Sequence, residues 1–259
     1  MNASKNLRAN HTGVFAGRLN RLRNKARLIE GFTRLELGAV LAGITLMFLV
    51  VVPLVAQGRP RSQLAVCLNN LRQVGQAMLT WNAQHGATDP WRVDVSDGGS
   101  RGHPSGLGNN LWFQFSWISN ELRTPRILAC PSDSAVIVAT DFGYLSTNSF
   151  LHPERRNAAI SYFLGLDALP DSPQHVLSAD RHARLEPFVT SCSSGLTPVY
   201  SIDGKTTEWS QTNIHGSVGH ILFHDGRVEL RSTAGLRQAF APAVADDNGS
   251  VHLLIPRPL

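Results

Sequence analysis

An uncharged apolar segment near the N-terminus constrains this chain more than any other feature. No Asp, Glu, Lys or Arg occurs in residues 37–57, and a single carboxylate, Glu36, stands just before them. A helix rises about 1.5 Å per residue, so about 20 apolar residues cover the ~30 Å hydrocarbon core of a bilayer. The segment is longer than the roughly 7–15 apolar residues of a cleaved secretory signal. It therefore predicts a helix that spans a membrane.

Basic residues are concentrated before this segment. The chain has 24 Lys and Arg residues, and seven of them precede Gly31, where Glu30 is the one acid. Acidic and basic residues nearly balance over the rest of the chain. The positive-inside bias therefore places the N-terminus in the cytoplasm and the C-terminal part in the periplasm or outside the cell. A near-neutral body lacks the basic face that binds nucleic acid, so we expect no nucleic-acid partner.

The cysteines set a limit on disulfide formation. The chain has three, Cys67, Cys130 and Cys192, and all follow the apolar segment. They would lie in an oxidising compartment, where disulfides persist. Because three is an odd number, at most one bridge forms within the chain. Two interpretations stay open: a Cys67–Cys130 disulfide, which we prefer, and three separate thiols.

Residues 31–37, of sequence GFTRLEL, resemble the processing and methylation motif of type IV pilins and type II secretion pseudopilins. The resemblance implies that a membrane prepilin peptidase cuts between Gly31 and Phe32 and that Phe32 is then N-methylated. Glu36 becomes the fifth residue of the mature chain. It also implies that Glu36 pairs with the N-terminal amine of a neighbouring subunit, which gives an otherwise costly intramembrane charge a partner.

The resemblance divides the chain into four parts. They are a basic leader (1–31), a transmembrane or filament-core helix (32–57), an amphipathic continuation of that helix (58–86), and a globular β-rich head (87–259). Pro53 lies where many pilin helices carry a proline, which kinks a membrane helix when neighbours satisfy the freed carbonyl. Apolar residues recur at spacings of three and four from Leu64 to Met78 and predict the amphipathic helix. Gly86 is expected to cap its C-terminus.

Two stretches of the head also resemble prepilin-type proteins. The first is the sequence Cys-Pro-Ser-Asp at residues 130–133, and the second is an H-x9-D-G element made by His215 and Asp225-Gly226. The Asp-Gly pair lies between two apolar runs and predicts a hairpin with strands at about 218–223 and 227–231. We interpret Asp225 as a turn residue, and His215 as a residue that hydrogen-bonds the hairpin to the body.

The same region contains side chains that bind zinc or form catalytic dyads elsewhere. These are His215, His220, His224 and Asp225. On alternating strand positions His220 and His224 would share a face, and His215 would lie outside the strand. No Cys-x-x-Cys or Glu-x-x-His pattern completes a metal set. We therefore interpret the motif as structural and expect no metal there.

The rest of the head is expected to form short elements and long loops. Residues 111–118 are rich in aromatic side chains and predict a core segment. The residues before Pro131 predict a short strand over 126–130. Two further strands are predicted at 159–165 and 175–180. The loop at 87–110 contains Asp89, Asp94 and Asp97, whose carboxylates are candidate ligands for calcium. Calcium would be the one cofactor of the chain. Residues 183–213 are expected to be mostly irregular.

The expected fold is α+β, with a long N-terminal helix packed on an antiparallel sheet, as in pilins. The expected function is that of a pilin-like (pseudopilin) subunit, and not an enzyme. Its partners would be prepilin peptidase, other pilin-like subunits and the bacterial inner membrane, in a type II secretion or type IV pilus-like machine. One alternative is a membrane-anchored periplasmic or surface binding module that does not polymerise. Another is an anchored hydrolase built on His215 and Asp225.

Overall fold

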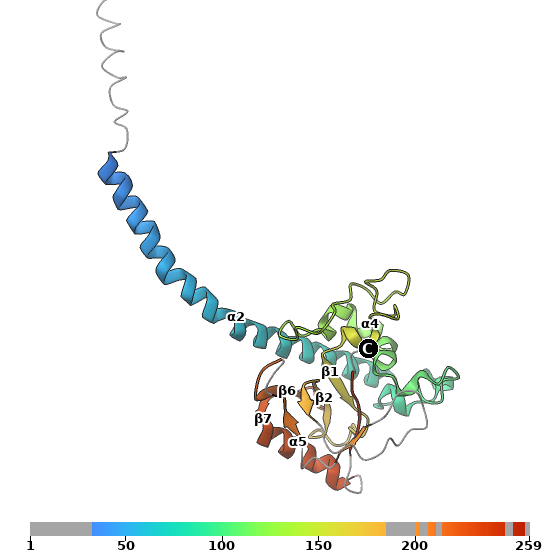
Figure 1. The fold of residues 1–259 in the computed structure, drawn as a ribbon. Helices are drawn as coiled ribbons and strands as arrows, with labels where there is room; N and C mark the ends of the chain where they lie inside the picture. Colours follow the sequence, from blue (N-terminus) through green and yellow to red (C-terminus); the bar gives the residue numbers. More distant parts are fainter. Residues whose placement is uncertain (1–32, 185–199, 203–206, 211–213, 247–250, 257–259) are drawn as a thin grey trace, which may run out of the picture. The chain divides into compact units, whose positions relative to one another are not determined.

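The computed structural model describes residues 33–184, 200–202, 207–210, 214–246 and 251–256. The chain divides into two compact units, Met1–Gln57 and Gly58–Leu259. Helix α2 (Arg34–Gln84) contributes residues to both units (Figure 1).

The N-terminal unit consists of the first part of α2. The window Arg34–Val52 has a mean hydropathy of 2.4, and none of it is buried. By length and composition this is the one helix in the described part of the chain that could cross a membrane. The prediction of an apolar helix near the N-terminus is therefore confirmed. Pro53 lies within the same helix.

In the C-terminal unit, the second part of α2 packs against a sheet. Its buried side chains include Cys67, Leu71, Val74 and Met78, which follow the predicted spacing of three and four residues. The helix ends at Gln84, and Gly86 adopts a left-handed conformation with φ +68°, as expected for a residue that follows a helix end. The amphipathic continuation predicted from the sequence is present.

The main sheet has six strands, all paired in antiparallel fashion, in the order β4-β8-β1-β2-β6-β7. The strands are β1 (Tyr162–Gly165), β2 (Val176–Asp180), β4 (Tyr200–Ile202), β6 (Val218–Phe223), β7 (Val228–Ser232) and β8 (Val251–Leu254). A separate pair joins β3 (Ala183–Arg184) to β5 (Glu208–Trp209). Strands β1, β2, β6 and β7 confirm four of the five predicted strands within a few residues. Within 183–213, predicted to be mostly irregular, β3, β4 and β5 are short strands, and residues 185–199, 203–206 and 211–213 lie outside the described residues.

The two faces of the sheet are covered by different helices (Figure 1). Tyr162 and Leu164 of β1 join the core that includes the α2 side chains. Phe163, between them, joins a second core with Phe240 of α5 (Thr233–Asp246). This alternation follows from the two-residue period of a strand. The C-terminal unit is therefore an α+β structure whose antiparallel sheet lies between α2 and α5.

The segments between α2 and the sheet form short helices. They are η1 (Pro90–Arg92), η2 (Val95–Asp97), η3 (Leu107–Asn109), α3 (Leu111–Trp117), α4 (Ser119–Leu122), η4 (Pro125–Leu128) and η5 (Arg156–Ala159). The aromatic stretch confirms the core prediction, because Leu111 and Phe115 are buried. The predicted strand over 126–130 is wrong. Pro125 fixes the first φ angle of a 3-10 turn there, and the Thr124 side chain accepts a hydrogen bond from the backbone of Arg126.

Candidate functional site

The predicted processing site lies at the start of the described chain. Gly31 and Phe32 fall outside the described residues, whereas Glu36 lies in the first turn of α2. The backbone N–H and the hydroxyl of Thr33 donate to Glu36 Oε2 at 2.9 and 3.0 Å, and Glu36 N donates to Thr33 Oγ1 at 3.2 Å. These reciprocal bonds form a capping box. Within a single chain, Glu36 therefore already has a partner in its own helix turn.

The apolar surface that follows Glu36 is not covered by any of the described residues. Leu46, Phe48 and Leu49 are each more than 60% exposed. Contiguous exposed apolar surface of this kind marks contact with lipid or with another protein. The first part of α2 is therefore a candidate packing surface.

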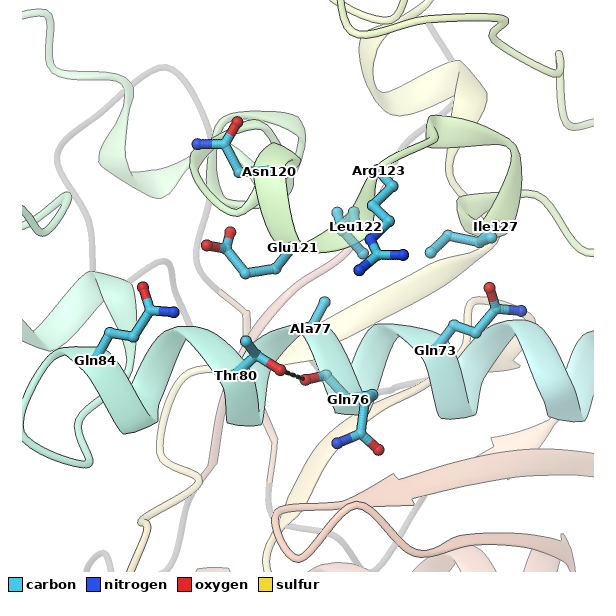
Figure 2. A pocket seen from close by; sticks show the side chains of 10 residues that line it. All are labelled: Gln73, Gln76, Ala77, Thr80, Gln84, Asn120, Glu121, Leu122, Arg123 and Ile127. Carbon is cyan, nitrogen blue, oxygen red and sulfur yellow. Dashed lines mark hydrogen bonds between the residues drawn. The ribbon is translucent and has the colours of Figure 1, made fainter.

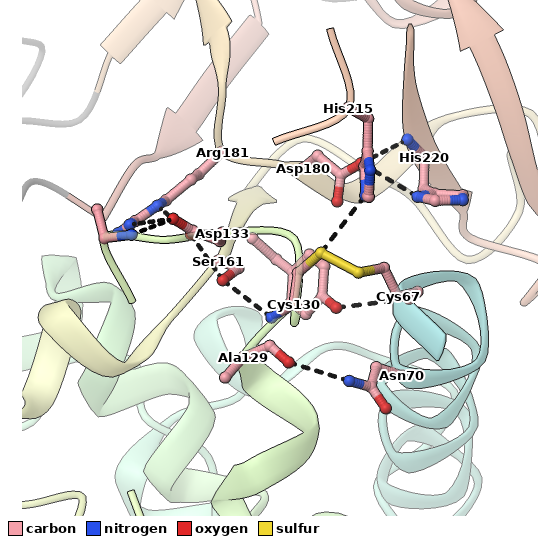
Figure 3. Close-up of a disulfide and its surroundings, with 12 residues drawn as sticks. Cys67, Asn70, Ala129, Cys130, Asp133, Ser161, Asp180, Arg181, His215 and His220 are labelled. Atoms are coloured by element: carbon pink, nitrogen blue, oxygen red, sulfur yellow. Dashed lines mark hydrogen bonds and ion pairs between the residues drawn. A yellow bond between two sulfur atoms is a disulfide. The ribbon is translucent and has the colours of Figure 1, made fainter. Parts of the chain in front are cut away.

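A disulfide ties α2 to the segment that follows η4. Cys67 and Cys130 are bonded, with a Cα–Cα distance of 4.9 Å across 63 residues of sequence. Cys130 N donates to Ser161 Oγ at 3.0 Å, and Asn70 Nδ2 donates to the carbonyl of Ala129 at 3.0 Å (Figure 3). The structure thus contains the pairing that the sequence left open against separate thiols. Cys192 lies outside the described residues.

The histidine of the H-x9-D-G element lies against this disulfide (Figure 3). His215 Nε2 is 3.4 Å from Cys130 Sγ and 3.7 Å from Asp180 Oδ2. Asp180 closes β2, and its Oδ2 accepts from the backbone N of His220 at 2.7 Å and lies 3.2 Å from His220 Nδ1. The side chains of His215, Asp180 and His220 are at most 2% exposed. His215 therefore connects β2, β6 and the disulfide inside the protein.

Burial lowers the pKa of two imidazoles, those of His215 and His182. It lowers the pKa of His215 to about 4 against the opposing attraction of the Asp180 carboxylate, and His220 and His182 lower that pKa further. Burial likewise lowers the pKa of His182, which stacks on Trp209. His215 and His182 are therefore neutral at neutral pH.

The Cys-Pro-Ser-Asp stretch ends in a buried ion pair. Asp133 Oδ2 lies 2.7 Å from Arg181 Nε and accepts from Ser161 Oγ at 2.8 Å, and Asp133 Oδ1 accepts from Arg181 Nη2 at 2.9 Å. The side chains of Asp133 and Arg181 are 2% and 9% exposed. Asp133 therefore fixes the position of Arg181, the residue that directly follows β2.

Asp225 and Gly226 shape the hairpin between β6 and β7. Asp225 Oδ1 accepts from the backbone N of Arg227 at 2.9 Å, and Gly226 has a φ of +84° and donates to the carbonyl of Phe223. This is a three-residue loop with glycine at its left-handed position. The turn role expected for Asp225 is confirmed.

The four residues considered for zinc or catalysis occupy three different places. His215 and His220 meet at Asp180, whereas His224 Nε2 lies 3.2 Å from Asp89 Oδ2. Asp225 pairs with Arg227 on the turn, so the proposed His215–Asp225 dyad is not formed. Asp180 is a residue that the sequence patterns did not single out, and it lies beside His215 and His220 in a group of three that could hold a metal ion. Its position at the end of a predicted strand was the one available signal.

The aspartates of the loop at 87–110 do not converge on a calcium site in the structure. Asp94 pairs with Arg101 at 2.7 Å, and buried Asp89 accepts from Asn82 Nδ2 at 2.9 Å besides its contact with His224. In the described ranges, groups of three ligand side chains occur as Cys67, Cys130 and His215, and as Asp180, His215 and His220. Neither group includes a residue of this loop.

A groove of about 470 Å³ lies between α2 and α4 (Figure 2). Gln73, Gln76 and Thr80 line its α2 side, and Glu121 and Arg123 line the other. No His, Cys or Asp is among the described residues that line it. The groove therefore lacks a constellation for nucleophilic or metal chemistry.

No protein-family model, no curated protein and no solved structure matches this chain.

Proposed function

We propose that this protein is a pilin-like (pseudopilin) subunit of a type II secretion or type IV pilus-like machine. Prepilin peptidase would cut it between Gly31 and Phe32 at the inner membrane, and Phe32 would be methylated. The mature chain would then assemble with other pilin-like subunits through α2, with the C-terminal unit outside the inner membrane. It would be a substrate of the processing enzymes and not an enzyme itself.

One observation carries this proposal. The residues that resemble a processing motif lead directly into a helix whose apolar side chains from Leu35 to Val52 are exposed among the described residues. Further along, the same helix packs on an antiparallel sheet. Such a helix can leave the bilayer for a filament core because both surroundings accept apolar side chains. A binding module that stays anchored needs the apolar helix but neither the glycine nor the glutamate.

Glu36 supports the proposal through its chemistry. A carboxylate near the end of a membrane segment costs a few kcal/mol unless it has a partner. Thr33 provides one within the precursor. After cleavage the amine of Phe32 becomes a cation, and a neighbouring subunit's Glu36 would be its partner. The capping box would thus hold the carboxylate until assembly.

Intact-mass measurement tests processing. Protein purified from membranes of a host with a prepilin peptidase is expected to lack residues 1–31 and to carry one additional methyl group. Gly31→Val is expected to keep the leader, because a branched side chain replaces the glycine at the cut. Gly38→Ala is the matched control, since the added methyl would meet no atom within 4 Å. A wild-type chain that keeps its leader would instead favour the anchored binding module.

Substitutions at Glu36 test assembly. Glu36→Gln keeps a side chain that can complete a capping box but removes the charge. It is expected to reduce incorporation into sheared filaments about 100-fold, because an unpaired amine in an apolar core costs about 3 kcal/mol. Thr33→Ala loses the cap, worth about 1 kcal/mol, and is expected to assemble. If Glu36→Gln assembled as wild type, pairing with the amine would not be the role of Glu36.

A further inference from the structure

Three ligand side chains converge at the junction of β2 and β6. Asp180, His215 and His220 each offer one ligand atom, and these atoms lie within 4.8 Å of one another. Asp180 Oδ2 is 3.2 Å from His220 Nδ1 and 3.7 Å from His215 Nε2. Ligand atoms about 2.0–2.2 Å from a tetrahedral zinc ion are separated by about 3.4 Å. An ion therefore fits between these atoms with small movements of the side chains.

The carboxylate of Asp180 lacks a compensating cation. Its ionic contacts in the described part of the chain are with His215 and His220, and no Lys or Arg reaches it there. Asp180 Oδ1 is buried and has no hydrogen-bond partner among the described residues. A buried carboxylate in this state is costly, and a bound cation would remove that cost.

A second unpartnered atom lies beside the cluster. The rings of His182 and His215 have centroids 6.1 Å apart. His182 Nε2 lies 3.1 Å from the carbonyl of Val218, so this nitrogen carries the hydrogen and Nδ1 carries a lone pair. His182 is 6% exposed, and its Nδ1 has no partner within the described residues. The neighbourhood of His215 thus contains two buried atoms, Asp180 Oδ1 and His182 Nδ1, without a hydrogen-bond partner among the described residues.

We propose that Asp180, His215 and His220 bind a zinc ion. Two imidazole nitrogens and one carboxylate oxygen suit zinc and leave a fourth coordination position open. The backbone N–H of His220 donates to Asp180 Oδ2 at 2.7 Å and orients the carboxylate, as an outer hydrogen bond does in metal sites. The ion would join β2, β6 and the segment before β6. This inference does not depend on filament assembly.

The disulfide decides which ligand set is available. Cys67 and Cys130 form the other group of three with His215. A cysteine binds a metal as its thiolate, and neither sulfur is a thiolate while the disulfide is intact. Both sets include His215. The set with Asp180 predicts metal binding by the oxidised protein, whereas the set with the two cysteines predicts binding only by the reduced protein.

Metal titration tests the site. The sample is the full chain with Cys192→Ser, kept in detergent. Thiol titration verifies its disulfide, and a chelator removes bound metal. Added Co²⁺ is expected to bind one per chain with a four- or five-coordinate visible spectrum and no thiolate charge-transfer band. Zn²⁺ is expected to displace it and to raise the melting temperature of the oxidised protein.

Variants assign the ligands. His215→Ala and Asp180→Asn are each expected to weaken Co²⁺ binding by more than the roughly 10–100-fold that loss of an outer partner costs. His252→Gln is the control, because His252 and Asp167 form a His–Asp pair 2.8 Å apart that belongs to neither ligand group. Circular dichroism verifies that each variant folds.

Three results would overturn the zinc site. They are no binding by the oxidised wild-type chain, undiminished binding by folded His215→Ala, and binding that requires reduction of the disulfide. The first needs no variant, so it decides the question even if the variants fail to fold. The third would assign the metal to the cysteines.

Discussion

Replacing Cys67 and Cys130 together by alanine is expected to lower the free energy of unfolding by about 4 kcal/mol. The bridge closes a loop across 63 residues, and the loss of loop-closure entropy in the unfolded chain predicts a value of this size. For a unit of this size the melting temperature should fall by about 10 °C. His215 Nε2 also loses its contact with Cys130 Sγ, which adds to the cost.

Thermal unfolding followed by circular dichroism measures this effect in the full chain. Cys192→Ser is the common background, so that no free thiol exchanges with the bridge. Reduction of the background protein should reproduce most of the loss, because it opens the same loop without changing a residue. A fall of less than about 3 °C in both cases would mean that the other contacts of Cys130, such as the bond from its N–H to Ser161, hold the segment in place.

Features that depend on residues close in sequence could be predicted. The apolar period from Leu64 to Met78 marks the buried face of α2, because residues three and four apart lie on one side of a helix. The Asp225-Gly226 pair marks the hairpin, because glycine reaches a positive φ without steric cost. Both signals arise within one element and need no knowledge of its neighbours.

Features that depend on pairing between distant segments could not be predicted. Asp180 meets His215 and His220 because β2 pairs with β6, and nothing local to Asp180 shows that pairing. Two members of the cluster, His215 and His220, could therefore be picked out from the sequence, and Asp180 could not. With three cysteines in the chain, the bridge between Cys67 and Cys130 was likewise one of several choices.

Helix α5 was missed for a different reason. Gly235 and Pro242 lie inside it, and both are poor residues for a helix interior. Leu236 and Phe240, four residues apart, bury completely against the sheet, and this packing outweighs the local preferences. The strand wrongly predicted over 126–130 is the opposite case. There the local effect of Pro125 decides the conformation.

The second large effect is expected at Arg181. Arg181→Met should lower the free energy of unfolding by about 3–5 kcal/mol, because it leaves the Asp133 carboxylate buried without its cation. Asp133 would keep bonds from Ser161 Oγ and from the backbone of Ala135, but these neutral donors do not remove the charge. The melting temperature of the full chain, followed by circular dichroism, measures the loss.

Arg101→Met provides the matched control for this substitution. Arg101 also forms an ion pair, with Asp94 at 2.7 Å, but the two side chains are 57% and 51% exposed. Water screens such a pair, so its loss should lower the melting temperature far less than the loss of Arg181 does. Adding Asp133→Asn to Arg181→Met should recover part of the stability, because it removes the charge left unpaired. Equal losses for Arg181→Met and Arg101→Met would show that Asp133 does not depend on Arg181. The Cys-Pro-Ser-Asp stretch would then be held chiefly by its disulfide.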